Sequence, residues 1–118
     1  MRKLTSHIVN PANDQIKITV RDQPGAGGAN HEYEIALPDG SGVRISFQNG
    51  PIAENGVNGI TQEVLLAIII DRLQSFQNGP FASKHNADAL FHAQMAQAAL
   101  LDRTLERMGR GVEGKSVV

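Results

Sequence analysis

Two arginines near the end of the chain are the residues best suited to bind an anion. Arg103 and Arg107 are four positions apart, so on a helix their guanidinium groups project from one face. Arginine presents a fixed fork of donors that matches the oxygens of a phosphate group. Asp102 and Glu106 lie beside them, however, and a solvated cluster of opposite charges explains the same pattern. The residues alone leave both interpretations open.

Other patterns that could support chemistry are weaker. The glycine-rich stretch 25–30 lacks the Lys-Ser/Thr of a phosphate-binding P-loop and precedes a predicted strand, so a flexible hairpin loop is favoured. His85 and His92 are separated by about 10 Å along a helix, too far for one metal site within one chain. The chain has no cysteine, which excludes disulfides and thiol nucleophiles. We expect no catalytic residue, no metal and no cofactor.

Composition restricts the classes of partner. The net charge is −1 and aromatic residues make up 4% of the chain, so neither a basic field nor an aromatic row for a nucleic acid polymer is present. The longest apolar run, residues 64–70, is far shorter than the ~20 residues that cross a bilayer. We therefore expect a cytoplasmic protein without a membrane partner. So few large aromatics also predict a thin core, which burial between subunits would reinforce.

The elements that must position these residues are strands followed by helices. Polar and apolar residues alternate in three segments separated by turn signals: 15–20, 31–37 and 43–47. They predict an antiparallel meander, preceded by a loosely held arm over residues 1–14. Thr61 is a suitable N-cap for a helix whose run 64–70 is apolar nearly all round and therefore buried on most sides. The sequence Asn-Gly-Pro at 78–80 ends this helix, with Gly79 in the left-handed conformation.

A second, longer helix follows, with Ser83 as its N-cap and an end at Gly109 and Gly111. Apolar or small side chains recur along it at helical spacing: Ala87, Phe91, Ala98, Leu101, Leu105 and Met108. The sequence therefore predicts an α+β fold, a small antiparallel β-meander followed by a long antiparallel helical hairpin in a single compact domain. Its parts are the arm and strands (1–60), the helical hairpin (61–114) and a disordered tail (115–118).

Several motifs, the most specific of them in the predicted hairpin, indicate more than the fold class because they resemble those of a known family. The most specific are FQNGPF at 76–81 and the final stretch with Arg103-Thr104, Arg107 and RGVEG at 110–114. HEYEI (31–35), ISFQNGPIAENGVNGIT (45–61) and LLAIIIDRL (65–73) fit as well, so the resemblance covers about residues 15–114. These motifs resemble the phage sponge proteins that inhibit the bacterial Thoeris defence, of the first-described type. That family shares a helical hairpin with anti-CBASS cyclic-nucleotide sponges.

The resemblance implies a function and a set of binding residues. It implies a phage protein that sequesters cyclic ADP-ribose isomers such as glycocyclic ADP-ribose in the host cytoplasm and does not cleave them. Some members also hold cyclic di- or trinucleotides at separate sites. The family's ligand contacts fall here on Phe76, Asn86, Arg103 and Arg107. An aromatic plane for adenine and two arginines for two phosphates are a suitable minimum set for such a ligand.

Helix geometry adds a constraint on that site. Asn86 and Arg103 are 17 residues apart on one predicted helix, a rise of about 25 Å. One small ligand cannot touch both within one chain. If all four residues serve one pocket, Phe76 and Asn86 come from one subunit and Arg103 and Arg107 from an antiparallel partner. The site thus predicts a homodimer with two equivalent pockets, and the resemblance adds a trimer of dimers.

Two other functions compete with the sponge. An enzyme that hydrolyses the same nucleotide would need a base, a nucleophile or a metal cluster beside the arginines, and none is recognisable in the sequence. A structural or regulatory phage protein would use the helices only as an oligomer seam and would bind no nucleotide. A screen for stabilisation by cyclic nucleotides separates this last alternative from the sponge.

Overall fold

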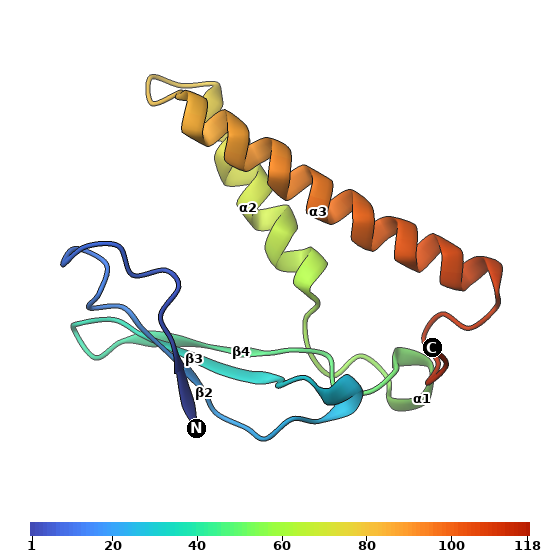
Figure 1. Ribbon diagram of the computed structural model, residues 1–118. Helices are drawn as coiled ribbons and strands as arrows, with labels where there is room; N and C mark the ends of the chain where they lie inside the picture. Colours follow the sequence, from blue (N-terminus) through green and yellow to red (C-terminus); the bar gives the residue numbers. More distant parts are fainter. The chain divides into compact units, whose positions relative to one another are not determined.

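The computed structural model describes residues 1–118 and divides them into two compact units, Met1–Ile60 and Thr61–Val118. The first unit holds four strands and two short helical segments: β1 (Arg2–Leu4), β2 (Lys17–Val20), η1 (Ala26–Gly28), β3 (Glu32–Ala36), β4 (Gly42–Ser46) and α1 (Ile52–Asn55). The second holds α2 (Gln62–Gln77) and α3 (Lys84–Gly109). The predicted α+β class, an antiparallel meander followed by a helical hairpin, is confirmed (Figure 1).

The sheet is fully antiparallel, with its strands in the order β1-β2-β3-β4. The three predicted strands correspond to β2, β3 and β4. The fourth, β1, forms within the stretch expected to be a loose arm, and pairs Arg2 with Val20 and Leu4 with Ile18. Its three residues are too few to show alternation, so only the pairing with β2 reveals them as an edge strand.

The turn between β3 and β4 explains the Pro-Asp-Gly-Ser-Gly signal at 38–42. The Ser41 hydroxyl and backbone N–H both donate to the Asp39 carboxylate, at 2.6 and 2.9 Å. These two hydrogen bonds hold the pKa of Asp39 below its usual value. Gly40 has a φ of 88°, which side-chain-bearing residues rarely adopt. The turn therefore sets the register of β3 against β4.

The core of the strand unit is small. Val20 is its one fully buried hydrophobic residue, at 1% exposure, and His31 is buried beside the sheet. Tyr33 and Phe47 pack edge to face with their ring centroids 5.5 Å apart.

Replacing Val20 with alanine is expected to lower the free energy of unfolding by about 1.5–3 kcal/mol, because it removes buried methyl groups from a thin core. Val43 in β4 is the matched control, since the same change there affects a side chain that is 57% exposed. Val43→Ala should cost less than about 0.5 kcal/mol. Urea unfolding of both variants measures the difference, and equal losses would show that Val20 does not anchor this unit.

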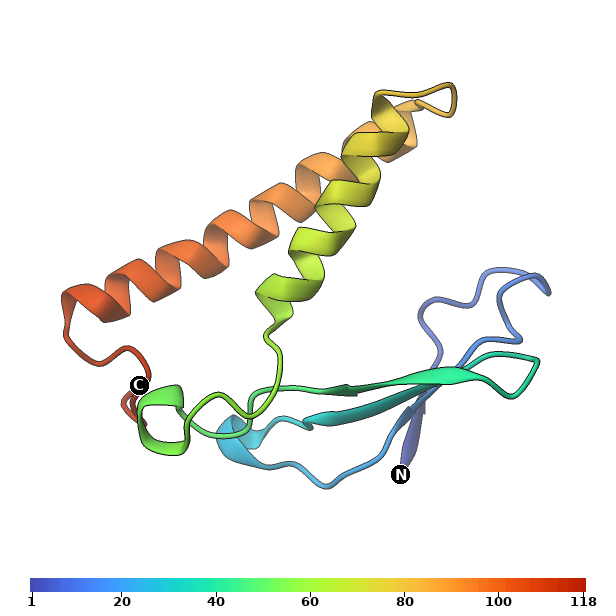
Figure 2. The same cartoon turned by 180° about the vertical axis from the view of Figure 1, so that it is seen from behind.

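The two helices of the second unit pack antiparallel, as predicted (Figure 2). Both predicted N-caps are confirmed. The Thr61 hydroxyl accepts from the Val64 N–H at 3.3 Å, and the Ser83 hydroxyl accepts from the Asn86 N–H at 3.0 Å. Helix α2 ends after Gln77, where expected, but Gly79 does not take the predicted left-handed conformation. Asn78 instead closes the helix near φ −89° with its N–H bonded to the Gln74 carbonyl.

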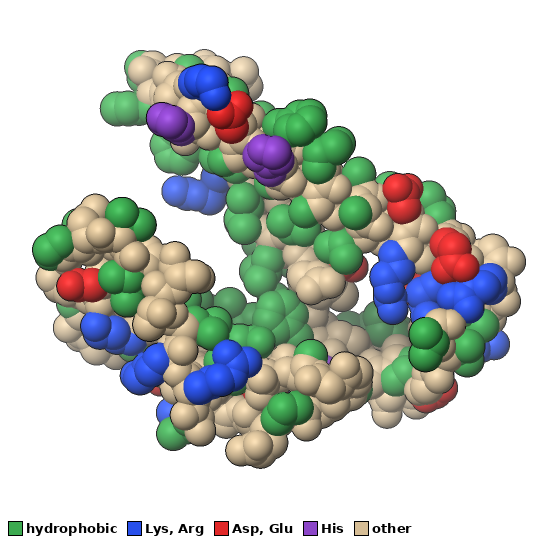
Figure 3. All heavy atoms as spheres, viewed as in Figure 1, with side chains coloured by type: hydrophobic (Ala, Val, Ile, Leu, Met, Phe, Trp, Pro, Cys, Tyr) green, Lys and Arg blue, Asp and Glu red, His purple; other side chains and the backbone are tan.

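The apolar run of α2 is less buried than its composition suggests. Ile70 is the only buried hydrophobic residue of the hairpin, whereas Val64, Ile68 and Ile69 are about half exposed. The predicted apolar positions of α3 are likewise exposed, among them Phe91, Leu101, Leu105 and Met108. Hydrophobic side chains therefore line the hairpin surface (Figure 3). The expectation that α2 is buried on most sides is wrong for a single chain, because α3 covers only one of its faces. Neither helix is long and apolar enough to cross a membrane.

Candidate functional site

A pocket lies at the turn of the hairpin. It is lined by the end of α2 and the turn that follows: Arg72, Ser75, Phe76, Gly79, Pro80 and Phe81. Its volume is about 290 Å³, and its walls are mainly apolar. That volume is at the lower end of the range for small-molecule sites. A nucleotide therefore needs additional surface beyond these six residues.

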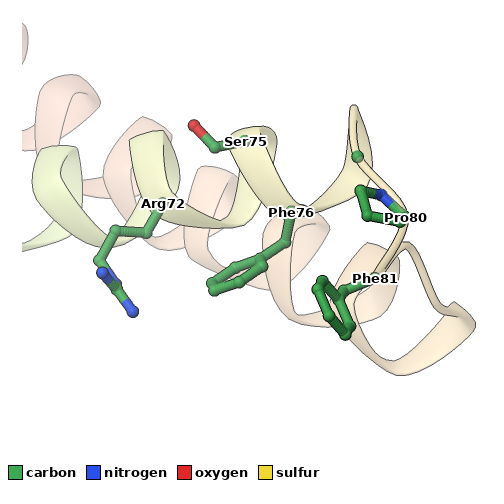
Figure 4. Close-up of a pocket in the computed structure, with 6 residues that line it drawn as sticks. Arg72, Ser75, Phe76, Pro80 and Phe81 are labelled. Atoms are coloured by element: carbon green, nitrogen blue, oxygen red, sulfur yellow. The ribbon is translucent and has the colours of Figure 1, made fainter.

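Phe76 forms an accessible wall of this pocket. Its side chain is 40% exposed, and Figure 4 shows its ring lying between Arg72 and Phe81. The Arg72 guanidinium carbon is 5.5 Å from the centroid of the Phe76 ring, a cation–π arrangement. The two residues are four apart on α2 and so share a face. Arg72 was not among the residues identified from the sequence; the signal that could have found it is its i,i+4 spacing to Phe76.

Asn86 lies at the same end of the hairpin. It occupies the first turn of α3, where its backbone N–H binds the Ser83 cap. Its side-chain amide donates to the carbonyl of Phe81 at 3.4 Å, and Phe81 lines the pocket. The structure thus brings Phe76 and Asn86 to one region of the hairpin.

Arg103 and Arg107 lie toward the opposite end of α3. This helix has 26 residues and α2 has 16, so α3 extends beyond its partner by about 15 Å. The intervening helix from Asn86 to Arg103 is continuous, so the predicted separation of about 25 Å stands within one chain. The structure does not bring all four predicted residues together in a single chain.

The two arginines have different surroundings. Arg103 is exposed and makes no hydrogen bond or ion pair within the chain. Arg107 is only 6% exposed. Its Nε donates to the Glu113 carboxylate at 3.2 Å, and its terminal nitrogens donate to the carbonyls of Val112, Lys115 and Val117.

For Arg107, the structure rejects the interpretation as part of a solvated charge cluster. This side chain does not stand on a solvated face paired with Glu106; that carboxylate pairs with Arg110 instead. The buried contacts come from residues 112–117, including part of the tail that was expected to be disordered. Local sequence spacing could not reveal them, because the chain must first turn back after Gly111, whose φ is 72°. Charged side chains gather at this end of the hairpin, as seen on the right of Figure 3.

No group of three or more His, Asp or Glu side chains lies close enough to hold a metal ion. The glycine-rich loop forms η1 and leads into β3 rather than into a helix of useful length, so it presents no helix N-terminus to a phosphate.

Comparison with known proteins agrees with the family suggested by the sequence motifs. Residues 39–104, more than half of the chain, match the model of the Acb2/Tad1 hairpin domain. This stretch contains Phe76, Asn86 and Arg103 and ends before Arg107. The chain is also similar to Thoeris anti-defense 1 of Bacillus phage SBSphiJ7, with 41% identity over 90 residues. That match covers 76% of this chain and 63% of the relative's length. The chain is therefore a member of the Acb2/Tad1 hairpin domain family.

Proposed function

We propose that the protein is a non-catalytic phage anti-defence sponge, which binds a cyclic ADP-ribose isomer and so removes a Thoeris signal in the host cytoplasm. The observation that carries this proposal is the pocket at the hairpin turn, where an exposed Phe76 ring stands beside the Arg72 guanidinium. The ring suits adenine and the cation suits a phosphate. Similarity to a Thoeris anti-defense protein supports the same ligand class.

The remaining phosphate contacts are proposed to come from a second copy of the chain. Arg103 lies too far from Phe76 to serve the pocket of its own subunit. An antiparallel partner would bring its Arg103 and Arg107 toward Phe76 and Asn86. The exposed apolar residues of both helices provide the surface that such a dimer would bury. Light scattering at micromolar concentration should give twice the mass of one chain, or six times that mass for a trimer of dimers, and a monomer would contradict the two-chain pocket.

A ligand-free structural protein is the competing function, and the exposed apolar helix faces favour it equally well. A thermal-shift screen separates the two, because a ligand that binds only the folded state stabilises it by about 2.7 kcal/mol at 100 times its Kd. We expect glycocyclic ADP-ribose or a related isomer to raise the melting temperature. Cyclic di- and trinucleotides belong in the same screen, since the sequence resemblance also implies separate sites for them. A flat response to every nucleotide would reject the sponge.

Binding without cleavage needs its own measurement. The protein is incubated with the stabilising nucleotide and then denatured, and the released ligand is analysed by chromatography. A sponge returns the nucleotide intact at every time point. Steady conversion to a product would identify an enzyme instead.

Substitution of Phe76 tests its role as the adenine platform. Phe76→Ala should weaken binding by about 1–3 kcal/mol, the range for a base stacked on an aromatic ring. The loss of stability should stay small, because the ring is already 40% exposed. Phe76→Tyr should keep most of the affinity, and Phe76→Leu should lose the stacking contribution.

Each Phe76 variant requires a melting curve and a calorimetric titration. A loss of about 3 kcal/mol in stability with unchanged affinity would instead place Phe76 in the packing of the hairpin.

A further inference from the structure

The guanidinium of Arg107 is already occupied by the chain itself. Residues 112–117, which we call the strap, follow α3 and fold back over this side chain. Glu113 supplies a carboxylate oxygen 3.2 Å from Nε, and the strap supplies carbonyls 3.0 and 2.9 Å from one terminal nitrogen. The Val117 carbonyl accepts a hydrogen bond from the other terminal nitrogen. Four of the five N–H donors of an arginine are therefore used.

A phosphate group would need these same donors. Its oxygens are recognised by the fork of Nε and a terminal nitrogen, which here faces Glu113 and the strap carbonyls. The Glu113 carboxylate has the charge and the geometry of an anionic ligand at this position. The chain therefore places an internal anion where an external one would bind.

We propose that the strap, through Glu113, is a built-in competitor for the anion site at Arg107, and that a phosphate-bearing ligand engages this arginine by displacing it. The inference rests on the proposed function and adds its regulation: the strap sets the affinity of the sponge. Arg103, one turn earlier, has no internal partner and receives a phosphate without competition.

The strap is built so that it can be released. Its one charged contact, Glu113, has a side chain that is 38% exposed, so water can replace that contact. Gly111 lies two residues before Glu113 and Gly114 directly after it, with φ values of 72° and 76°, and glycine can leave this left-handed conformation without a steric penalty. Four of the six strap residues are exposed and none is fully buried. Release of the strap therefore uncovers little apolar surface.

The test neutralises the competitor without changing its shape. Glu113→Gln should raise the affinity for glycocyclic ADP-ribose by about 3–10-fold, a partial effect because solvent screens a part-exposed pair. Glu106→Gln is the matched control, since it makes the same charge change near the same helix end but pairs with Arg110. The control should alter affinity by less than about 2-fold. Unchanged or weaker binding by Glu113→Gln would overturn the proposal.

Hydrogen exchange provides a second measurement that needs no ligand. It tests the contact between Glu113 and Arg107 independently of the proposed sponge function. The N–H groups of Val112 and Lys115 are hydrogen-bonded within this region, to the carbonyls of Arg107 and Val112. Their hydrogen exchange should be faster in Glu113→Gln than in the wild type or in Glu106→Gln. Equal exchange would show that Glu113 does not hold the strap. Suppose that exchange is faster in Glu113→Gln but neither this variant nor the wild type binds any nucleotide. The sponge function is then rejected, and with it the competition at Arg107, while the contact between Glu113 and Arg107 is kept as a structural one.

Where the wild type binds the ligand, exchange also tests displacement directly. Saturation with glycocyclic ADP-ribose should increase exchange at Val112 and Lys115, because the ligand takes over the Arg107 donors. Slower exchange in the complex would mean that the strap closes over the ligand rather than yielding to it, and would overturn the competitive arrangement.

Discussion

Replacing Arg107 with alanine is expected to reduce both stability and ligand binding. The change removes a buried guanidinium and its hydrogen bonds to Glu113 and to three strap carbonyls. Hydrogen bonds to charged groups contribute about 1.5–3 kcal/mol each when buried, but the released groups regain water, so we expect a net loss of about 1–3 kcal/mol in unfolding free energy. Affinity for the nucleotide should fall by about one to two decades.

Chemical denaturation and calorimetric titration measure the two effects separately. Arg107→Lys is the informative control, because lysine keeps the charge but cannot serve Glu113 and the strap with a planar fork. It should retain part of the binding while losing most of the strap contacts. An alanine variant with unchanged stability would show that the strap contacts contribute nothing to the folded state.

Arg103→Ala, in contrast, should reduce ligand binding without reducing stability. Its side chain is exposed and makes no contact within the chain, so the free energy of unfolding should change by less than about 1 kcal/mol. Affinity should still fall by about one to two decades, the contribution of a charge-assisted contact to phosphate.

Arg110→Ala serves as the matched control for Arg103. This substitution removes the same charge near the same helix end. The Arg110 side chain, however, pairs with Glu106 and lies outside the proposed site. If Arg103→Ala and Arg110→Ala weaken binding equally, the effect is general electrostatic attraction rather than a specific contact.

The parts of the fold that local patterns control were predictable. Alternation located β2, β3 and β4, and the hydroxyls of Thr61 and Ser83 marked the starts of α2 and α3. These signals depend on neighbours within four residues. Strand β1 carried no such signal, because its assignment depends on pairing with β2.

Burial and side-chain partners were harder to predict, because they depend on contacts distant in the sequence. The apolar run of α2 indicated burial, yet one partner helix covers only one face of it. One of the two interpretations of the sequence placed Arg107 among solvated charges, but this side chain is enclosed by residues 112–117 after a left-handed turn at Gly111. For the candidate site, the predicted helix ends placed Phe76 and Asn86 near the turn of the hairpin, where the structure has them, while their binding roles come from the family resemblance and stay a prediction. Arg72 was missed, because its spacing of four residues from Phe76 carries weight only once the structure shows that both side chains line one pocket.

If each ligand pocket is built by two chains, mixed dimers of two binding-defective variants should regain one functional pocket. In the proposed homodimer, Phe76→Ala and Arg103→Ala should each impair both pockets. A dimer with one chain of each kind would contain one pocket with both defects and one pocket with an intact Phe76 and an intact Arg103. Two affinity tags allow such mixed dimers to be purified and titrated with glycocyclic ADP-ribose. We predict one site of wild-type affinity per mixed dimer, whereas the absence of any such site would contradict the two-chain pocket.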